Sequence, residues 1–313
     1  MRTVLVTGGA GFLGSHVCDR LLAQGERVIA IDPLVTGRIA NLAEARTYGA
    51  TFTFYNMDPG SDRFGQLLDR HRPEVVVHLA GRPTAAAIED PLADAETTVI
   101  GTLRLLEGCA RIGVRKVVYA ARGDALYGDA KKVPVAERMY ASSHPRSPEG
   151  ISRRVVLDYL AAYERYRGLD WVALALANVY GPRQDPAVEG GAVATFAALL
   201  VAGAVPTVLG DGNQTRDFVF VADVAHAFAL AVDRGHGRLV NVGTGRETSV
   251  NALYRLLTGI VGVGPKPAAG SLPPGDLRRM ALDPALAAEV LGWRPWTHLE
   301  DGLAETVAYL RGV

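Results

Sequence analysis

Residues 2–16 read Arg2-Thr-Val-Leu-Val-Thr-Gly-Gly-Ala-Gly-Phe-Leu-Gly-Ser-His16 and combine a short apolar run with closely spaced glycines. The apolar run, residues 4–6, has the β-branched character of a buried parallel strand. Gly9, Gly11 and Gly14 then follow with the spacing G-x-G-x-x-G, and a helical pattern of apolar residues begins among them. Glycines between a strand and a helix let the backbone approach a pyrophosphate, whose charge then meets the helix N-terminus. The stretch therefore predicts a dinucleotide-binding α/β fold.

An acidic residue, Asp32, follows the next apolar run at residues 27–31. At the end of that strand a carboxylate can accept hydrogen bonds from both hydroxyls of an adenosine ribose. The same carboxylate would repel a 2′-phosphate, so the predicted cofactor is NAD rather than NADP. The alternative interpretation is a tight glycine turn that holds no ligand.

Two later stretches extend the predicted cofactor site. Asp58 follows a third strand at residues 51–55 and either meets the adenine or only forms the turn before Pro59. A further buried strand at residues 75–81 ends in small residues, where a cofactor backbone can pass, and its His78 is interpreted as a packed strand-end histidine. The predicted cofactor-binding residues of these stretches are Gly8, Gly11, Phe12, Leu13, Gly14, Asp32, Asp58, Leu79, Ala80 and Gly81.

Strands and helices alternate along the first half of the chain, which indicates a doubly wound parallel sheet of the Rossmann type. We expect the NAD-binding domain at residues 1–177 and a smaller, mainly substrate-binding domain at 178–313, with 239–243 returning to the first sheet as a strand. Asp283 is expected to be the N-cap of a helix whose first residue is Pro284. Further strands are expected at residues 116–121 and 171–176, and helices at 96–112, 151–166 and 192–202.

The composition is that of an ordinary globular protein, with 313 residues, 49% of them hydrophobic and 21% charged. Lys and Arg balance Asp and Glu at 33 each, without a long basic run, which argues against nucleic acid or an anionic membrane as partner. Cys18 and Cys109 have neither metal-ligand spacing nor the number for a disulfide framework. The first strand follows the N-terminus directly, and the most apolar stretch, 192–205, is too short to span a bilayer. We therefore expect a cytoplasmic protein.

With these motifs the chain resembles the extended short-chain dehydrogenase/reductase family, the nucleotide-sugar epimerases and dehydratases. The resemblance implies tightly held NAD, a nucleotide-sugar substrate, and a homodimer formed through the helices at 96–112 and 151–166. It also implies that Asn178 and Arg216 face the diphosphate and that Val208 lies near the base, whereas an arginine common in the family is replaced by Pro273. The motifs that carry the resemblance are Thr7-Gly-Gly-Ala-Gly-Phe-Leu-Gly14, His78-Leu-Ala-Gly81, Tyr127-Gly128-Asp129, Asn178-Val-Tyr-Gly-Pro-Arg-Gln184, Gly210-Asp-Gly-Asn-Gln-Thr-Arg-Asp-Phe218, Asn241-Val-Gly-Thr-Gly245 and Gly275-Asp276.

The catalytic positions depart from that family. Gly123 stands where the family has Ser or Thr, and Glu149 and Arg153 stand where it has Tyr and Lys. Glu149 and Arg153 are one helical turn apart, and both the arginine and the helix N-terminus favour an ionised glutamate. We predict that Glu149 is the base and that Arg153, which cannot relay a proton, orients the cofactor. The alternative is an ordinary helix ion pair.

Asp124 matches an aspartate in the acid/base set of the dehydratases and is either a catalytic acid or a loop cap. The neighbouring Ala125 replaces a glutamate of that set, which argues against a standard 4,6-dehydratase. Tyr127, Tyr140 and His144 are further candidate proton carriers. The predicted function is epimerase/dehydratase-type chemistry on a nucleotide-activated sugar with a non-standard catalytic set. A catalytically silent NAD and sugar-nucleotide binding protein, and an enzyme acting on a non-sugar metabolite, are the alternatives.

Overall fold

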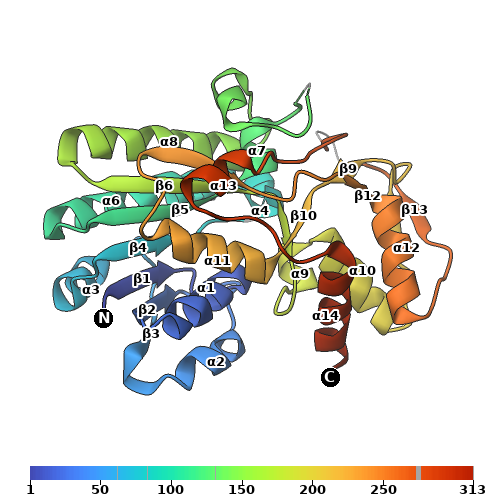
Figure 1. Ribbon diagram of the computed structural model, residues 1–313, viewed down its shortest axis with the longest axis horizontal. Coiled ribbons are helices and arrows are strands. Elements are labelled where there is room, and N and C mark those ends of the chain that lie inside the picture. Colours follow the sequence, from blue (N-terminus) through green and yellow to red (C-terminus); the bar gives the residue numbers. More distant parts are fainter. Residues whose placement is uncertain (62, 83, 131, 273–275, 313) are drawn as a thin grey trace.

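A seven-stranded sheet forms the centre of the protein, seen here in a computed structural model that describes residues 1–61, 63–82, 84–130, 132–272 and 276–312. The strand order is β11-β6-β5-β4-β1-β2-β3, and every neighbouring pair is parallel (Figure 1). The order reverses at β1, and ligands of doubly wound sheets bind beside that point, at the carboxyl ends of the strands. The strands are β1 (Thr3–Thr7), β2 (Arg27–Asp32), β3 (Phe52–Asn56), β4 (Val75–His78), β5 (Lys116–Arg122), β6 (Asp170–Leu176) and β11 (Arg238–Val242).

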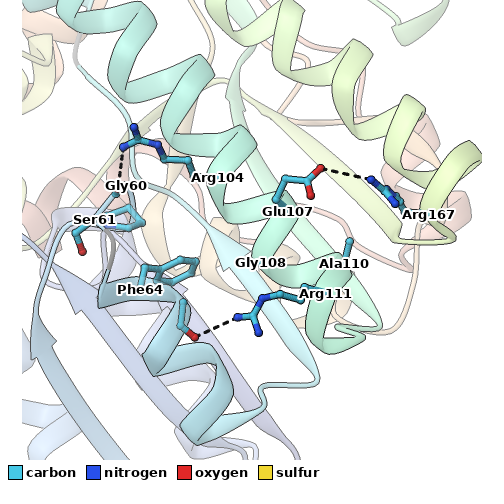
Figure 2. Close-up of a pocket in the computed structure, with 11 residues that line it drawn as sticks. Gly60, Ser61, Phe64, Arg104, Glu107, Gly108, Ala110, Arg111 and Arg167 are labelled. Atoms are coloured by element: carbon cyan, nitrogen blue, oxygen red, sulfur yellow. Dashed lines mark hydrogen bonds and ion pairs between the residues drawn. The ribbon is translucent and has the colours of Figure 1, made fainter.

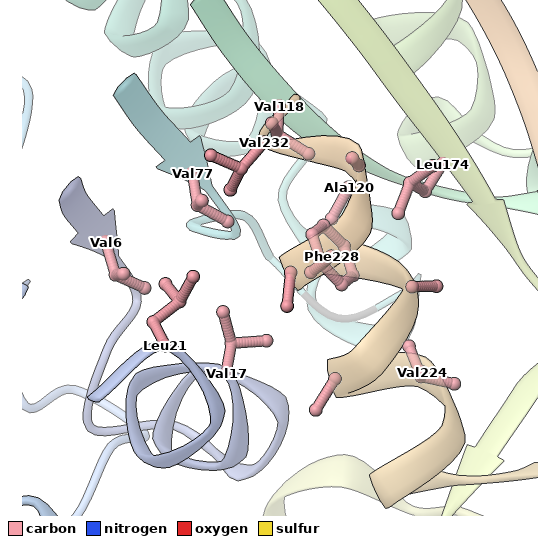
Figure 3. Close-up of a cluster of buried hydrophobic side chains, with 14 of the residues drawn as sticks. Val6, Val17, Leu21, Val77, Val118, Ala120, Leu174, Val224, Phe228 and Val232 are labelled. Carbon is pink, nitrogen blue, oxygen red and sulfur yellow. The ribbon is translucent and has the colours of Figure 1, made fainter. Parts of the chain in front are cut away.

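Side-chain alternation along the strands divides the core into two layers. Leu5 of β1 packs toward α3, α6 and α8, whereas Val6 packs toward α1 and α11 on the opposite face. Figure 3 shows Val6 near Leu21 of α1, and Phe228 of α11 among the strand side chains. Because both faces are covered by helices, the strands are almost uniformly apolar. The helices of this unit are α1 (Phe12–Ala23), α2 (Ala43–Arg46), α3 (Arg63–His71), α4 (Thr84–Glu89), α5 (Pro91–Asp94), α6 (Gly101–Ile112), α7 (Gly123–Tyr127), α8 (Pro148–Arg167), α11 (Val221–Ala231) and α13 (Ala285–Val290).

A second lobe is built from C-terminal segments and has a core of its own. Phe196, Leu253 and Leu303, from three different helices, meet in this core. Figure 1 shows α10, α12 and α14 gathered at one end of the molecule. The lobe comprises α9 (Pro186–Glu189), α10 (Ala192–Val201), α12 (Val250–Val261), α14 (Leu299–Arg311) and three two-stranded pairings: β7 (Asn178–Tyr180) with β10 (Phe218–Phe220), β8 (Thr207–Leu209) with β13 (Ala268–Gly270), and β9 (Thr215–Arg216) with β12 (Thr248–Ser249).

Several boundaries differ from the sequence-based predictions, and three of them concern how a helix begins. The helix expected at 96–112 begins as a π-helical segment, Ala95–Ile100 (η3), and is α-helical only from Gly101. The helix expected from 151 begins at Pro148, because the Ser147 hydroxyl accepts a hydrogen bond from the Gly150 N–H and caps it. Pro284, and not Asp283, occupies the N-cap position of α13; the Asp283 carboxylate instead accepts a hydrogen bond from the Ala285 N–H at 3.0 Å.

Residues 239–243 were predicted to return to the first sheet, and the strand β11 confirms this by pairing with β6 at the edge. The six short strands of the second lobe were not predicted, because each has only two or three residues. Within the described part of the chain, no helix is long and apolar enough to cross a membrane.

Candidate active site

A cavity of about 1030 Å³ lies at the carboxyl ends of β1, β2, β4 and β5 and extends to the second lobe. Every predicted cofactor-binding residue lines it, as do Glu149, Asp124, Asn178 and Arg216. Segments far apart in the sequence therefore meet at the point where the strand order reverses, where a doubly wound sheet binds its ligand.

The glycine loop is shaped for close approach of a ligand backbone. Gly8 has φ of +68°, and a Cβ there would lie 3.2 Å from the Ala80 nitrogen. A Cβ at Gly14 would lie only 2.0 Å from the Gly8 carbonyl oxygen, so a larger residue would displace α1 from the loop. Gly11, the N-cap of α1, brings no side chain between the helix N-terminus and the cavity. This arrangement fits the pyrophosphate of a dinucleotide.

The carboxylate of Asp32 is fixed at the end of β2. Its Oδ2 accepts a hydrogen bond from the Ala10 N–H at 3.0 Å, and its Oδ1 accepts one from the Leu34 N–H at 2.8 Å. Each oxygen keeps a further lone pair, so two ribose hydroxyls can be bound at once. Burial raises the pKa of Asp32, and the backbone N–H groups of Leu34, Ala10 and Gly11 oppose that shift. A 2′-phosphate would meet this carboxylate at close range, which fits NAD.

A buried hydrogen-bond chain holds the loop at residues 79–81. The Thr102 hydroxyl donates to the Thr98 carbonyl, so His78 donates from Nε2 to Thr102 and accepts at Nδ1 from Thr7. The Thr7 oxygen in turn accepts the N–H groups of Leu79 and Ala80, each at 3.2 Å. Burial lowers the pKa of His78 to about 3, with the Arg153 charge adding to the shift, so the ring is neutral. His78 is thus the packed strand-end histidine that the sequence indicated.

Asp58 fits both interpretations offered from the sequence. Its Oδ1 accepts a hydrogen bond from the Gly60 N–H at 2.7 Å, which forms the expected turn. Asp58 also lines the large cavity.

A second cavity, of about 600 Å³, lies between α3 and α6 and shares Gly60, Ser61 and Arg104 with the large cavity (Figure 2). Arg104 donates to the Gly60 carbonyl at 2.8 Å, so this wall supports the turn of Asp58 from outside.

Glu149 and Arg153 lie together on the first two turns of α8. Arg153 donates from Nε to Glu149 Oε1 at 2.9 Å, from Nη1 to the Ala120 carbonyl at 2.9 Å, and from Nη1 to the Tyr119 hydroxyl at 3.4 Å. A Cβ at Gly81 would lie 2.9 Å from Arg153 Nη2, so the glycine leaves the room that the guanidinium occupies.

The Glu149–Arg153 pair is buried, with side-chain exposures of 1% and 9%. Burial disfavours the charged form of Arg153, but Tyr119 and Glu149 outweigh this effect, so the pKa of Arg153 lies above its ordinary value. The pair is therefore not an ordinary exposed helix ion pair, whose contribution would be a few tenths of a kcal/mol.

Asp124 is held by the arginine that precedes it by two residues. Arg122 donates from Nε to Oδ1 at 3.0 Å and from Nη2 to Oδ2 at 2.6 Å, and the Ala125 N–H adds a bond at 2.8 Å. Burial works against the charged form, yet Arg122 outweighs it, so the pKa of Asp124 lies below the ordinary value. This environment favours the ionised carboxylate and fits the loop-cap interpretation of Asp124, whereas its role as a catalytic acid stays a prediction.

Gly123 does not face the cavity. A Cβ at this position would lie 2.6 Å from Leu282 Cδ1, so a side chain there would point into the core. Arg122, next to it at the end of β5, lines the cavity instead. The sequence comparison placed the missing hydroxyl at 123, whereas the geometry directs the neighbouring side chain toward the site.

The three other candidate proton carriers lie outside the cavity lining. The Tyr127 hydroxyl is buried and donates to Asn241 Oδ1 at 2.7 Å. The Arg154 guanidinium carbon lies over the Tyr140 ring, 4.6 Å from the ring centroid. Burial raises the pKa of Tyr140 to about 12. His144 is exposed. Glu149 lines the cavity and these three residues do not, so the geometry favours Glu149 as the base.

Two of the three predicted substrate residues lie at the substrate side of the cavity. Asn178 and Arg216 line it, and Arg216 is held by Asp276 at 2.5 Å and by the Leu277 carbonyl at 2.7 Å. Val208 is directed away, because alternation along β8 turns it into the core of the second lobe. Thr207 and Leu209 on either side line the cavity instead. Pro273 lies outside the described residues.

Comparison with known proteins identifies the family of the chain. Residues 4–243 match the model of the NAD dependent epimerase/dehydratase family. A UDP-glucose 4-epimerase of Mycolicibacterium smegmatis is 43% identical over 313 residues, covering 99% of both chains. A UDP-glucose 4-epimerase structure from Thermotoga maritima with UDP-glucose superposes with a TM-score of 0.94 at 40% identity. One from Thermus thermophilus with NAD gives 0.91 at 36%, and both alignments cover 99% of each chain.

The chain belongs to the NAD dependent epimerase/dehydratase family. The predicted fold class, the NAD cofactor and epimerase/dehydratase-type enzyme chemistry on a nucleotide sugar are thereby confirmed at the level of the family. The sequence analysis missed Arg122, Thr207, Leu209 and Gln214 among the lining residues. Arg122 could have been found from its place directly after a strand that ends at the site.

Proposed function

We propose that the protein is an NAD-dependent epimerase that inverts a hydroxyl-bearing carbon of a UDP-activated sugar, with Glu149 in place of the usual base. The observation that carries this proposal is the buried carboxylate of Glu149, which lines the cleft beside Arg153. The UDP-glucose 4-epimerases described above support a UDP-sugar and inversion at C4.

Bound NAD would supply a hydride acceptor and later the hydride donor. Glu149 would take the proton of the sugar hydroxyl as the hydride leaves the same carbon, and would return it when the hydride is delivered to the opposite face of the keto sugar. Arg153 remains charged and stays bonded to Ala120, so it holds Glu149 in place and orients the cofactor without moving a proton.

The remaining contacts divide between the two ends of the substrate. Arg216, with Asn178, would bind the diphosphate, since a guanidinium suits phosphate geometry. Thr207 and Leu209, which line the cavity, would take the place near the nucleotide base that Val208 was expected to occupy. Asp124, ionised and paired with Arg122, would orient a sugar hydroxyl as an acceptor.

The organisation around this site is proposed on similar grounds. Residues 1–177, with β11 and α11 (Val221–Ala231), would form the NAD-binding domain, and most of 178–313 the substrate domain. Exposed apolar side chains on η3 and α8, among them Ile100, Ile151 and Tyr159, support a homodimer centred there. Cys18 and Cys109 are free thiols, which supports a cytoplasmic location.

Incubation of the purified protein with UDP-glucose tests the proposal. Chromatography of the nucleotide sugars should show UDP-galactose approaching an equilibrium mixture, and a reduced-nicotinamide absorbance should appear transiently. Binding of UDP-glucose without a product or an absorbance change would favour the silent homologue. Absence of binding to any nucleotide sugar would favour a non-sugar substrate.

A further inference from the structure

A five-residue segment, Gly181 to Asp185, leaves the second lobe between β7 and α9 and lies against the NAD-binding unit; we call it the strap. The Pro182 carbonyl accepts a hydrogen bond from His16 Nε2 of α1 at 3.0 Å. The strap therefore crosses from one lobe to the other.

Arg183 forms two ion pairs with the NAD-binding unit. Its Nη1 donates to Asp19 Oδ2 of α1 at 2.6 Å, and its Nη2 donates to Glu44 Oε2 of α2 at 3.2 Å. Arg183 and Asp19 are mostly buried, with side-chain exposures of 16% and 10%. Removal of one member of a mostly buried pair leaves the other charge without compensation, so breaking this ion pair costs more than breaking a surface pair.

The backbone of Arg183 supports the same reading. Its φ is +68°, a left-handed conformation that is uncommon for residues other than glycine, asparagine and aspartate. A residue held there is strained, and the strain persists only where surrounding contacts impose it. The two ion pairs of the side chain are such contacts.

Asp185 makes the last crossing. Its Oδ1 caps α9 by accepting the Ala187 N–H at 3.0 Å, and its Oδ2 pairs with the guanidinium of Arg38. The Arg38 N–H donates to the Ala10 carbonyl at 2.9 Å, inside the glycine loop. The strap is thus bonded to the segment that follows Asp32 and, through it, to the loop expected to hold the pyrophosphate.

The strap also borders the cavity itself. Gln184 lines the cavity from the second lobe, whereas Asp32 and Thr36 line it from the NAD-binding unit. The Arg38–Asp185 and Arg183–Asp19 pairs, whose side chains do not line the cavity, join the strap to the NAD-binding unit. A dinucleotide seated against Gly11 and Asp32 would share the cavity with Gln184 of the strap.

We propose that the strap is an interlobe latch that retains bound NAD, and that opening its ion pairs limits the rate of cofactor exchange. The consequence is a cofactor that stays in place while sugar nucleotides come and go. The Arg183–Asp19 pair is mostly buried, and desolvated charges act mainly on dissociation rates, so the effect should appear in the off-rate of the dinucleotide.

The test is the dissociation of etheno-NAD, a fluorescent analogue, from the loaded protein after mixing with excess NAD. Arg183→Asn removes the charge but keeps a residue that tolerates the left-handed backbone, and it should accelerate release by ~10–100-fold. Arg183→Lys keeps the charge and should restore most of the parent rate. No sugar nucleotide is present, so the outcome does not depend on the proposed reaction.

The second pair is tested by a double-mutant cycle of Arg38→Gln and Asp185→Asn, the latter keeping the N-cap of α9. Each single change should accelerate release by ~3–10-fold, and the double variant should release etheno-NAD no faster than the singles. Arg115→Gln is the matched control, since its pair with Glu74 lies at the amino ends of the strands, and it should leave the off-rate unchanged.

Circular dichroism on each variant separates loss of the latch from loss of the fold. An off-rate for folded Arg183→Asn within twofold of the parent would overturn the proposal. Independent, multiplicative effects of the two changes at 38 and 185 would overturn it for that pair.

Discussion

Arg153 lies one turn after Glu149 on α8 and donates a hydrogen bond from its Nε to Glu149 Oε1 at 2.9 Å. Neither side chain is appreciably exposed. A pair in this setting does not behave as a surface ion pair. Its Coulomb attraction is weakly screened, and removal of one partner leaves a buried charge. The relationship therefore fixes the orientation of the glutamate inside the cleft, which a catalytic base requires.

Replacement of the Glu149 carboxylate by an amide tests the base directly. Glu149→Gln keeps the size and an acceptor for Arg153 Nε, so NAD binding should change little. Turnover should fall by ~10²–10⁴-fold, the usual range for a positioned acid or base. The measurement is single-turnover conversion of UDP-glucose together with NAD titration. A variant that turns over at the parent rate would remove Glu149 from the mechanism.

Restoration of the family's catalytic residues should depend on where a hydroxyl is placed. Glu149→Tyr combined with Arg153→Lys should give at most weak epimerase activity, because no hydroxyl from the end of β5 assists. Adding Arg122→Ser should raise that activity, since position 122 faces the cavity. Adding Gly123→Ser should not raise it, since that side chain would meet Leu282. Initial rates of the two triple variants decide between the positions, and a higher rate for the serine at 123 would contradict the assignment.

The preference for NAD over NADP should depend on Asp32. Asp32→Ala removes an ionised acceptor of two ribose hydroxyls, which should weaken NAD by ~10–100-fold. NADP should bind the variant at least as well as the parent, because the repulsion is gone. Isothermal titration of both dinucleotides gives the two affinities. Equal affinities of NAD and NADP for the parent protein would refute the assignment.

Acid should destabilise the protein through its buried neutral histidines. Burial lowers the pKa of His78 from 6.5 to about 3 and that of His16 to about 4. The unfolded chain therefore binds protons below about pH 6.5 that the folded protein does not, so stability falls as the pH decreases from 6.5 toward 4. Each histidine should contribute about 1.4 kcal/mol per pH unit within this window.

Urea unfolding at several pH values measures that slope. His78→Asn keeps hydrogen-bonding groups for Thr7 and Thr102 and should reduce the slope by the share of one proton. His298→Asn, at an exposed position, is the control and should retain the parent slope. If the free energy of unfolding of His78→Asn changes with pH as steeply as that of the parent, His78 does not contribute to the loss of stability in acid.

The proposed dimer should dissociate when charge is placed on α8. Ile151→Glu combined with Tyr159→Glu should convert the protein to a monomer, because two carboxylates per subunit would face each other across a buried interface. Light scattering at micromolar concentration measures the mass. Tyr309 of α14 is about as exposed as Ile151 and Tyr159, and Tyr309→Glu should leave the dimer intact. A monomeric parent protein would rule out the assembly itself.

Residues 2–32 were sufficient to predict a dinucleotide-binding α/β fold, the glycine loop and the cofactor carboxylate, because these depend on local spacing between a strand and a helix. Glu149 and Arg153 could also be paired from sequence, since i and i+4 positions on a helix are neighbours. Their burial could not, because it depends on β5 and on Gly81, which are distant in sequence.

Placements that depend on side-chain direction were less predictable. Val208 lies one position from Thr207 and Leu209, but neighbouring side chains of a strand point to opposite faces. A strand of three residues is too short for its sequence to show which face is buried. A side chain at position 123 would meet Leu282, which is far away in the sequence, so its direction could not be predicted from neighbouring residues. The role of Asp124 likewise changed once the fork of Arg122 was seen to hold its carboxylate.

The path of the chain out of the first sheet and back has a consequence for how the molecule unfolds. Everything between β6 and β11 is an insertion with respect to the sheet, and α11, within that insertion, covers the same face as α1. A fragment cut after residue 177 would lose the edge strand β11 and expose Val17 and Leu21. The two lobes therefore share one cooperative unit, and heating should give a single calorimetric transition rather than two.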